Sequence, residues 1–416
     1  MKVVIVSQYY PPEPVPIPHA LAQELAERGH DVRVLTAYPN YPEGKLMSGY
    51  KQRRVHVEND GNVRVRRIPI HISHSRNPLG RLLNYGSFAL SSLAAGRFTI
   101  DADVVYVYAT QMTAAIAPSW WYRHRKTPFV LHVQDLWPES ITGSSLIHGG
   151  GKLINCVLTP WLRRMYSRAA ATIAIGPTMA RMLAERGAPV ERVHTVYNWG
   201  DEVAVDSSRR LELGDPNDHK SFRLMYAGNV GELQDLEVVL RAVALVRDLE
   251  GFSFEIVGSG VAEQNIKDLA AELDLHNVVF RGRVASAQMG MHYARADFQM
   301  VPLKDLEIFG ATIPSKLQAS LANAVPVITT VSGDVRELVL DNRLGLYSPP
   351  GNPGLLAETF RTAYAMSDID RRQMAERARE FYAAKMSMKS GVDKIERILA
   401  SAVRLSNRKK SDARKL

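Results

Sequence analysis

The sequence has a single cysteine, Cys156, and no long run of apolar residues. One cysteine excludes an internal disulfide framework and is typical of proteins of the reducing cytosol. No apolar run approaches the ~20 residues that a membrane-spanning helix needs. The opening residues 1–7 are typical of a buried strand and not of a secretion signal. We therefore expect a cytoplasmic protein without a transmembrane segment.

Motifs of several common enzyme classes are also missing. The histidines are scattered and the lone cysteine cannot complete a zinc-ligand spacing. There is no Gly-x-Ser-x-Gly elbow of a serine hydrolase, no P-loop lysine motif and no dinucleotide fingerprint with its acidic partner. These absences make a serine hydrolase or a nicotinamide enzyme improbable, and we expect neither a metal site nor a cofactor.

Positive charge is concentrated in the first half of the chain. Residues 1–200 carry 23 lysines and arginines against 13 aspartates and glutamates, and residues 51–100 alone carry 9 against 2. Such asymmetry indicates an anionic partner, or simply a solvated basic face. No recognisable nucleic-acid module accompanies the basic residues, so nucleic acid is the weaker choice and an anionic membrane surface the stronger one.

Short β-rich runs alternate with amphipathic helical stretches along the whole chain. Strand–helix alternation predicts parallel sheets joined by right-handed crossovers, and hence an α/β fold. In the first half the expected strands are Val3–Ser7, Asp31–Thr36, Val104–Tyr108, Phe129–Val133 and Thr172–Ile175, with helices such as His19–Arg28 and Thr178–Arg186.

The same alternation restarts near residue 222, which predicts a second domain. Its expected strands are Phe222–Tyr226, Phe254–Val257, Val278–Arg281, Phe298–Val301 and Val327–Thr330. The polar segment 201–220 is interpreted as the linker. We therefore assign residues 1–200 to the first domain and 201–385 to the second. Residues 407–416 form a basic tail that we expect to be disordered.

Loops that follow strands carry candidate anion-binding residues, because parallel α/β sheets bind ligands beyond the carboxyl ends of their strands. Two glycine-containing loops each follow a strand and precede a helix, so their backbones could approach a phosphate, although such loops also make simple tight turns. They contain Gly228, Asn229 and Gly231 in one and Gly258 and Gly260 in the other. Ser315 and Lys316 lie later in the chain, in the first turn of an expected helix. There they could bind an anion such as a diphosphate, unless Lys316 is an ordinary exposed lysine.

The end of the strand Phe129–Val133 and the loop after it hold the candidate catalytic residues. His132, Asp135 and Glu139 place an imidazole and two carboxyl groups at one expected edge of the sheet. Such groups can position an acceptor hydroxyl or accept its proton. The alternative is a structural loop anchored by Trp137.

Two helices of the basic half carry aromatic and arginine residues beside an apolar stripe. This composition suits a helix that lies in a lipid headgroup region, but equally a core helix with a basic outer face. The candidate membrane contacts are Arg81, Tyr85 and Phe88 on one helix and Trp161, Arg163 and Arg164 on the other.

These motifs together resemble the GT-B-fold glycosyltransferases of family 4, especially the bacterial branch that builds O-antigen and capsular polysaccharides and includes L-fucosamine transferases. The resemblance covers nearly the whole chain. It rests on Tyr9-Tyr10-Pro11-Pro12-Glu13, Tyr38-Pro39-Asn40-Tyr41-Pro42-Glu43-Gly44-Lys45, Asp135-Leu136-Trp137-Pro138-Glu139-Ser140, Tyr197-Asn198-Trp199-Gly200-Asp201, Ile256-Val257-Gly258-Ser259-Gly260 and Pro314-Ser315-Lys316.

The resemblance implies two Rossmann-like, doubly wound domains with an interdomain cleft. It also implies a sugar transfer with retention from a nucleotide-diphosphate sugar, taken to be UDP-linked. The basic amphipathic helices favour a lipid-linked saccharide at the inner face of the membrane as the acceptor. The donor belongs to the second domain and the acceptor to the first, where we assign Glu13 and His19 to the acceptor. The final helix, expected at Gly391–Ala402 within residues 386–406, returns to the first domain.

This sequence departs from the family pattern at the donor side. Two family glutamates fall on Ala311 and Ala319, for which Asp305 or Glu307 could substitute. The usual arginine and lysine of the first loop fall on Asn229 and Gln234. The diphosphate charge then falls on Lys316, helped by Arg283 or by Arg281 and Lys304.

Two other functions stay open at this point. A GT-B-fold epimerase would act on a soluble nucleotide sugar and would need no membrane helices. A non-catalytic partner of a polysaccharide complex would bind a nucleotide sugar without transferring it.

Overall fold

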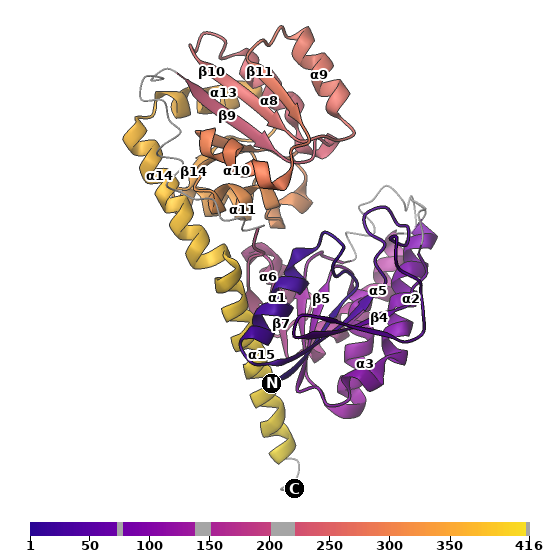
Figure 1. Cartoon of the computed structure of the whole chain (residues 1–416). Helices are drawn as coiled ribbons and strands as arrows, with labels where there is room; N and C mark the ends of the chain where they lie inside the picture. Colours follow the sequence, from indigo (N-terminus) through magenta and orange to yellow (C-terminus); the bar gives the residue numbers. More distant parts are fainter. Residues whose placement is uncertain (73–77, 138–150, 201–220, 413–416) are drawn as a thin grey trace. The chain divides into compact units, whose positions relative to one another are not determined.

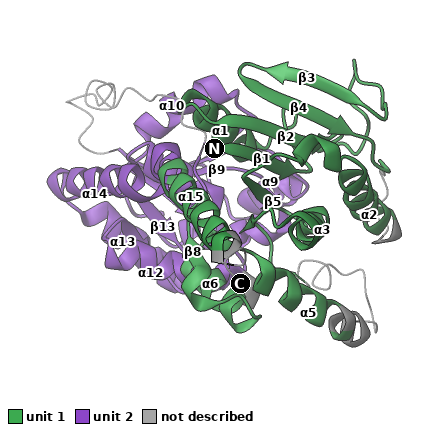
Figure 2. Cartoon of the chain, turned by 90° about the horizontal axis from the view of Figure 1, so that it is seen from below, with its two compact units in different colours: residues 1–197, 391–416 green, residues 198–390 purple. Residues whose placement is uncertain are grey.

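A computed structural model describes residues 1–72, 78–137, 151–200 and 221–412 (Figure 1). The chain forms two compact units (Figure 2). Unit 1 comprises Met1–Tyr197 together with Gly391–Leu416, and unit 2 comprises Asn198–Ser390. The segment 201–220, interpreted as the linker, lies outside the described residues.

Unit 1 is built on an eight-stranded sheet of order β3-β4-β2-β1-β5-β6-β7-β8. Every neighbouring pair is parallel except the antiparallel pair β3 and β4 at one edge. The strands are β1 (Lys2–Ser7), β2 (Asp31–Ala37), β3 (His56–Asp60), β4 (Val63–Ile68), β5 (Val104–Ala109), β6 (Phe129–Val133), β7 (Ala171–Ala174) and β8 (Val193–Thr195). The central strands are continuous apolar runs because helices cover both faces of a parallel sheet.

Helices α2, α3 and α5 belong to one face of this sheet. The connections from β4 to β5, β5 to β6 and β6 to β7 all step in the same direction, and right-handed crossovers then place their helices on the same side. The helices of unit 1 are α1 (Pro16–Glu27), α2 (Pro78–Ala94), α3 (Ile116–Arg125), α5 (Gly151–Arg168), α6 (Pro177–Glu185) and α15 (Met388–Asp412), with short 3₁₀ turns such as η2 (Met112–Ala115). Figure 2 shows α2, α3 and α5 along one side of the unit.

An ion cluster holds α15 against the end of α1. Arg28 Nη1 lies 2.6 Å from Asp393 Oδ1 and 2.7 Å from Glu396 Oε2, while its Nε donates to Glu24 at 2.9 Å. His30 Nε2 lies 2.8 Å from the other oxygen of Glu396. These bonds and the buried residues Val392, Ile395 and Leu399 attach the last helix to unit 1.

Unit 2 is built on a six-stranded parallel sheet of order β11-β10-β9-β12-β13-β14. Its strands are β9 (Phe222–Ala227), β10 (Phe252–Val257), β11 (Val278–Gly282), β12 (Phe298–Val301), β13 (Val327–Thr329) and β14 (Gly345–Tyr347). Its helices are α8 (Leu236–Ala244), α9 (Glu263–Glu272), α10 (Ser286–Arg295), α11 (Ser315–Ala322), α12 (Asp334–Asp341), α13 (Pro353–Ala365) and α14 (Asp368–Phe381). Phe222, Phe252 and Phe298 stack beneath this sheet in the core.

The tail prediction was wrong for the residues that the structure describes. Residues 407–412 continue α15, which runs from Met388 to Asp412 and is longer at both ends than the predicted Gly391–Ala402. The sequence remains compatible with a helix through Leu405 and Arg408. The helix therefore continues beyond its last buried residues. Residues 413–416 lie outside the described residues.

Candidate active site

Two glycine-containing loops lie side by side at the carboxyl edge of the unit 2 sheet. The first follows β9 and the second follows β10, and Val230 N donates to Ser259 O at 3.0 Å between them. A Cβ atom on Gly258 would lie 1.9 Å from the carbonyl oxygen of Gly228, and the φ of Gly258 is +137°. Glycine is therefore required at residue 258 by loop packing alone, before any ligand is considered.

These loops line a hollow of about 550 Å³ in unit 2. Its wall is made of backbone at the loops and of partly apolar side chains beyond them, a composition typical of sites for small molecules. The lining residues are Ala227, Gly228, Asn229, Val257, Gly258, Ser259, Gly260, Arg283, Val284, Met289 and Tyr293. Gly231 lies beside this group, where a Cβ atom would come 2.7 Å from Asn229 Nδ2.

Lys316 lies directly over the first glycine-containing loop. It is in the first turn of α11, next to the exposed Ser315, and its Nζ donates to Gln234 Oε1. A Cβ atom on Gly228 would come 2.9 Å from Lys316 Cε, so the missing side chain of Gly228 makes room for the lysine. The ammonium also lies 5.3 Å above the ring of Tyr226.

Burial lowers the pKa of Lys316 to about 8, because desolvation disfavours the charged ammonium. No carboxylate of the first turn of α11 offsets this charge. A diphosphate bound beside Gly228 would supply the missing negative charge and raise this pKa again. The arrangement is that of an anion-binding lysine over a backbone loop.

Other charged residues of unit 2 contribute less to this hollow. Arg283 is exposed and lines it, whereas Arg281 donates to Glu255 at 3.0 Å and is already paired. Lys304 and Asp305 are exposed. Ala311 is buried and Ala319 is half-buried, and their methyl side chains supply no polar group. The side chain of Glu307 is not among those described.

The carboxyl edge of the unit 1 sheet brings together loops that follow β1, β2, β5 and β6. Asp135, two residues after β6, is exposed. Neighbouring protein atoms nevertheless displace part of its solvent, and this raises the pKa of its carboxyl group. The same carboxylate raises the pKa values of Tyr9 and Tyr108, so it lies close to both phenols. An exposed carboxylate of raised pKa among tyrosines is suited to bind a hydroxyl and accept its proton.

His132 does not belong to this edge, and its predicted catalytic role needs correction. It points into the core from β6 with none of its surface exposed, and its Nδ1 lies 2.5 Å from the Oη of Tyr106. Burial lowers its pKa to about 3, so the ring is neutral. A fully buried ring cannot transfer a proton to an acceptor outside the core. His132 was assigned because it is close in sequence to Asp135, but it belongs to β6, a central strand whose residues are all buried.

Glu13 is also buried and has a different role from the predicted contact with the acceptor. Its Oε1 accepts the backbone N–H groups of Asn40 and Tyr41 at 2.9 Å each, and its Oε2 accepts that of Tyr10 at 3.2 Å. Burial raises its pKa, while these N–H groups act in the opposite direction. With both oxygens occupied and 3% of its surface exposed, Glu13 ties two loops together and does not face a ligand.

His19 is half-buried on α1 and is paired within unit 1. Its Nε2 lies 3.2 Å from Asp60 Oδ2, and its ring stands edge-on to Tyr10 with centroids 5.6 Å apart. The Oη of Tyr10 donates to the same carboxylate at 2.9 Å. The structure therefore shows His19 in a polar cluster beneath the β1 loop, and its assignment to the acceptor stays a prediction.

A chain of side-chain amides crosses the carboxyl edge from β5 to α2. Thr110 donates to Gln111, Gln111 to Gln8, and Gln8 to Asn84 at 2.7 Å. Gln8 and Gln111 are almost completely buried, so each amide is satisfied by its neighbours. Sequence reasoning missed this chain because single glutamines in loops carry no pattern.

The loop after β6 is anchored by Trp137, which is 4% exposed. Its ring lies 6.0 Å from that of Tyr85 on α2, and its carbonyl accepts from Arg186 Nη1 at 2.7 Å. The anchoring proposed for Trp137 and the exposure of Asp135 are therefore compatible. Glu139 lies outside the described residues.

The two candidate membrane helices present a different surface from the predicted one. Phe88 is completely buried, which corrects its assignment, and Tyr85 packs on Trp137. Instead, α2 exposes Leu82, Leu83 and Leu90 at 62%, 49% and 70%. On α5, Trp161 is half-buried, whereas Arg163 and Arg164 are exposed. The side chain of Arg81 is not described.

The inward face of both helices was mistaken for their outer face. Leu162 and Met165 of α5 are buried like Phe88, because the wide apolar stripe packs on the sheet. Within the described residues, no helix is both long and apolar enough to cross a bilayer. The described part also contains no cluster of three or more histidine, cysteine or acidic side chains arranged to hold a metal ion.

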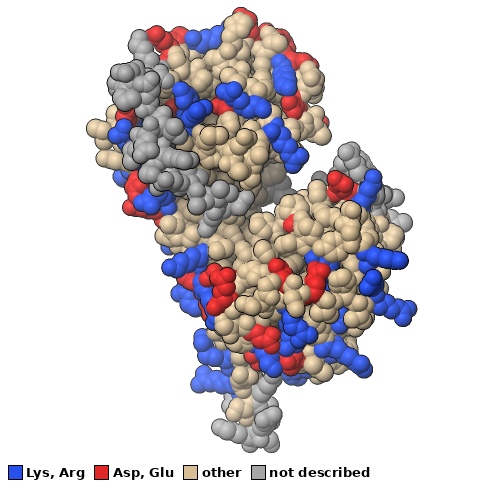
Figure 3. All heavy atoms as spheres, viewed as in Figure 1, with Lys and Arg blue, Asp and Glu red and all other residues tan. Residues whose placement is uncertain are grey.

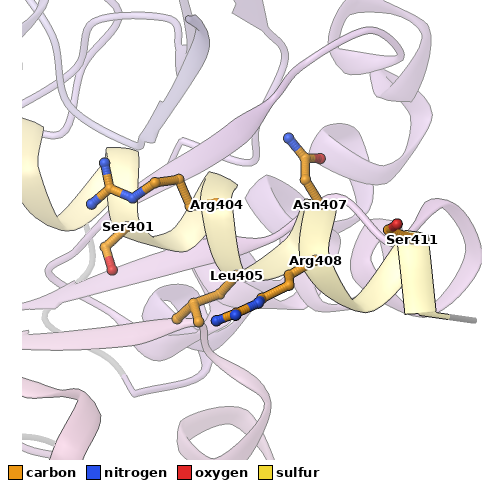
Figure 4. A pocket seen from close by; sticks show the side chains of 6 residues that line it. All are labelled: Ser401, Arg404, Leu405, Asn407, Arg408 and Ser411. Carbon is orange, nitrogen blue, oxygen red and sulfur yellow. The ribbon is translucent and has the colours of Figure 1, made fainter.

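A second hollow, of about 620 Å³, runs along the end of α15 (Figure 4). All its lining residues come from that one helix: Ser401, Arg404, Leu405, Asn407, Arg408 and Ser411. In the face shown in Figure 3, lysine and arginine side chains are scattered over both units and mixed with acidic ones. A groove with a single wall gives no enclosure for a substrate, so we look for candidate sites at the carboxyl edge of each sheet separately.

Comparison with known proteins agrees with this division of the chain. A Glycosyl transferase 4-like domain matches residues 15–199, and a Glycosyl transferases group 1 domain matches residues 221–366. WcaI of Escherichia coli K12, named for glycosyl transfer in colanic acid biosynthesis, is 30% identical over 298 residues, which cover 67% of this chain and 71% of WcaI.

A second relative is the glycosyltransferase WbjE of Pseudomonas aeruginosa, 26% identical over 238 residues that cover 55% of this chain and 58% of WbjE. Among solved structures, Anabaena HepE in complex with UDP and glucose aligns with a TM-score of 0.63 at 17% identity, over 96% of this chain and 100% of HepE.

The two α/β units and the glycine-lined hollow thus define a glycosyltransferase of the GT-B fold. The chain belongs to the glycosyltransferase family of WcaI. It combines a glycosyl transferase 4-like domain with a group 1 domain. Its closeness to polysaccharide-biosynthesis enzymes supports this activity over the epimerase and the non-catalytic partner.

Proposed function

We propose that this enzyme transfers a sugar from a UDP-linked donor, with retention, to a lipid-linked saccharide acceptor in cell-surface polysaccharide biosynthesis. The observation that carries the proposal is Lys316, a desolvated ammonium over the Gly228 loop and beside the unit 2 hollow. The names of WcaI and WbjE support the reaction class, and the UDP bound to HepE supports the nucleotide. An O-antigen or capsule pathway of the L-fucosamine transferase branch remains the specific expectation.

The proposed division of labour follows the two carboxyl edges. Lys316, Ser315 and the backbone N–H groups of the glycine-containing loops hold the diphosphate, while Arg283 contacts the outer part of the nucleotide. Asp135 receives the acceptor hydroxyl. The reaction needs no metal or cofactor in this proposal, because Lys316 and the backbone N–H groups of the glycine-containing loops offset part of the charge of the leaving diphosphate.

The test is transfer by the purified full-length chain from radiolabelled UDP-, GDP- and dTDP-sugars to lipid-linked saccharides extracted from membranes. We expect product from a UDP-sugar, an anomeric configuration by NMR identical to that of the donor, and undiminished activity with EDTA. Transfer only from a GDP- or dTDP-sugar, or an inverted product, would contradict the donor or the stereochemistry proposed.

Attachment to an anionic membrane surface is the second part of the proposal. We define the leucine face of α2 as Leu82, Leu83 and Leu90, and the exposed Arg163 and Arg164 of α5 lie on the same side of the sheet. Apolar side chains would enter the lipid, and each arginine near the surface would contribute about 1 kcal/mol. On this proposal the enzyme works at the inner face of the cell membrane and is held there by these surface contacts.

Sedimentation with phosphatidylcholine vesicles, with and without phosphatidylglycerol, tests this attachment. We expect binding only with the anionic lipid, and weakening between about 0.1 M and about 1 M salt as the Debye length shrinks from about 10 Å to about 3 Å. Leu90→Glu and the pair Arg163→Glu with Arg164→Glu should release the protein, whereas Arg241→Glu on α8 should not. Equal binding by all these proteins would exclude the surface.

A further inference from the structure

Two tyrosine rings form a small aromatic surface at the carboxyl edge of unit 1. Tyr9 follows β1 and Tyr41 lies in the loop after β2, with ring centroids 5.3 Å apart and planes inclined by 50°. Tyr41 is 44% exposed and Tyr9 is half-buried. Neither ring is fully buried, so part of the pair is accessible to a ligand.

The loops that carry these rings are fixed from below by Glu13. One carboxylate oxygen accepts the N–H groups of both Asn40 and Tyr41, and the other accepts that of Tyr10, next to Tyr9. Ser7 adds a bond from its hydroxyl to the carbonyl of Tyr9 at 2.6 Å. A buried carboxylate is costly unless donors surround it, and here all the donors come from these two loops.

Polar groups that could recognise hydroxyls lie beside the aromatic surface. The carboxylate of Asp135 and the phenol of Tyr85 both contribute to the raised pKa of Tyr9, and therefore lie close to its hydroxyl. Flat apolar surface next to hydrogen-bonding groups matches a pyranose, whose C–H face is apolar and weakly positive while its hydroxyls point outward. The negative face of an aromatic ring attracts such a C–H face.

We propose that Tyr9 and Tyr41 form a stacking platform for a saccharide ring of the acceptor, and that Glu13 is the positioning residue of this platform. The inference rests on the proposed function for the acceptor's identity, but saccharide binding can be measured without transfer. A platform beside Asp135 would hold the acceptor ring while a hydroxyl reaches the carboxylate.

Saturation-transfer NMR on the full-length chain is the direct test. The probes are methyl glycosides of glucose, galactose, mannose, N-acetylglucosamine and L-fucose, with uridine as an aromatic competitor. We expect saturation of the C–H protons on one face of at least one glycoside, lost in Tyr41→Ala and kept in Tyr41→Phe. The matched control is Trp120→Ala, because Trp120 on α3 is 45% exposed, stacks on His124 and lies outside the platform.

Three outcomes would overturn the platform: no saturation of any glycoside, an equal signal in Tyr41→Ala, or a signal confined to uridine. None of these depends on transfer activity. Absence of transfer from every nucleotide sugar would instead overturn the proposed function and leave the NMR result to decide the platform.

Kinetics with an active acceptor then separate positioning from general stability. Tyr41→Ala should raise the acceptor KM about tenfold, equivalent to about 1.4 kcal/mol, and leave the donor KM and kcat within about twofold. Glu13→Gln should raise the acceptor KM similarly, and its effect should be smaller in the Tyr41→Ala background, because Glu13 acts partly through that ring. Additive effects in the double variant would reject Glu13 as a positioning residue. If Glu13→Gln fails to fold, Tyr41→Ala alone decides the platform.

Discussion

The carboxyl edges of the two sheets use different means to build a site. In unit 2 the edge is made of backbone: Gly228 and Gly258 bring two loops into contact, and one lysine supplies the charge. In unit 1 the edge is made of side chains, with tyrosines, Asp135 and a chain of buried amides. Under the proposed function, a diphosphate common to many donors is bound by backbone geometry, whereas a particular acceptor is bound by side chains.

The largest effect should come from the carboxylate of unit 1. Asp135→Asn should lower kcat about 100-fold and leave the donor Kd unchanged, since an amide cannot accept the acceptor's proton. Glu27→Gln, an exposed carboxyl group on α1, is the matched control. Because the pKa of Asp135 is raised, kcat of the wild-type enzyme should fall on the acidic side as this group becomes protonated. Full activity of Asp135→Asn would show that Asp135 does not accept the proton of the acceptor hydroxyl.

A second prediction separates the core of unit 1 from its edge. His132 has a pKa of about 3 when folded and about 6.5 when unfolded, so the unfolded chain binds more protons between these values. The stabilisation is present above pH 6.5 and is lost as the pH falls. Between pH 7 and pH 5, the unfolding free energy of the wild type should therefore fall by about 2 kcal/mol more than that of His132→Phe. Urea unfolding at the two pH values measures this difference. If the unfolding free energy of His132→Phe depends on pH as that of the wild type does, the His132 ring is accessible to solvent and not buried in the neutral form.

On the donor side, Lys316→Ala should weaken nucleotide binding about tenfold, because a charge-assisted contact contributes roughly 1.5–3 kcal/mol. Calorimetry with UDP measures the effect without an acceptor. Lys267→Ala, on α9 and paired with Glu263, provides the control. Equal affinity in Lys316→Ala and the wild type would show that backbone alone binds the diphosphate, which would sharpen the contrast between the edges.

The smallest effect concerns pH. With a pKa of about 8, Lys316 loses its proton above that pH, and the UDP dissociation constant should rise about fivefold between pH 8 and pH 9. Lys316→Arg should abolish this rise, because a guanidinium stays charged. For the ligand-free protein the sign is opposite: the depressed pKa makes folding more favourable as the pH rises from about 8 towards 10.5. If the dissociation constant of Lys316→Arg rises in the same way, the pH dependence belongs to the titration of another group.

The sequence predicted the strands and the loops of the site better than it predicted side-chain direction. Continuous apolar runs such as Val3–Val6 identify central parallel strands, but the alternating polar residues of β3 and β4 hide an edge hairpin. Phe88 was assigned to a surface because periodicity shows which residues share a face and not which face is covered, and His132 was assigned to the site because it is close in sequence to Asp135. The role of Glu13 depends on N–H groups of residues 40 and 41, a contact between distant loops that no local pattern reveals.

The bonds between Arg28, Asp393 and Glu396 also bear on how the chain is synthesised. Unit 2 is a continuous segment inserted within unit 1, so it has left the ribosome before α15 is complete. Unit 1, whose strands emerge first, must wait for the last segment of the chain to cover α1. Domains generally fold as units during synthesis, from the amino end onward. Here unit 2 can fold before unit 1 is complete, because the last helix of unit 1 follows unit 2 in the sequence.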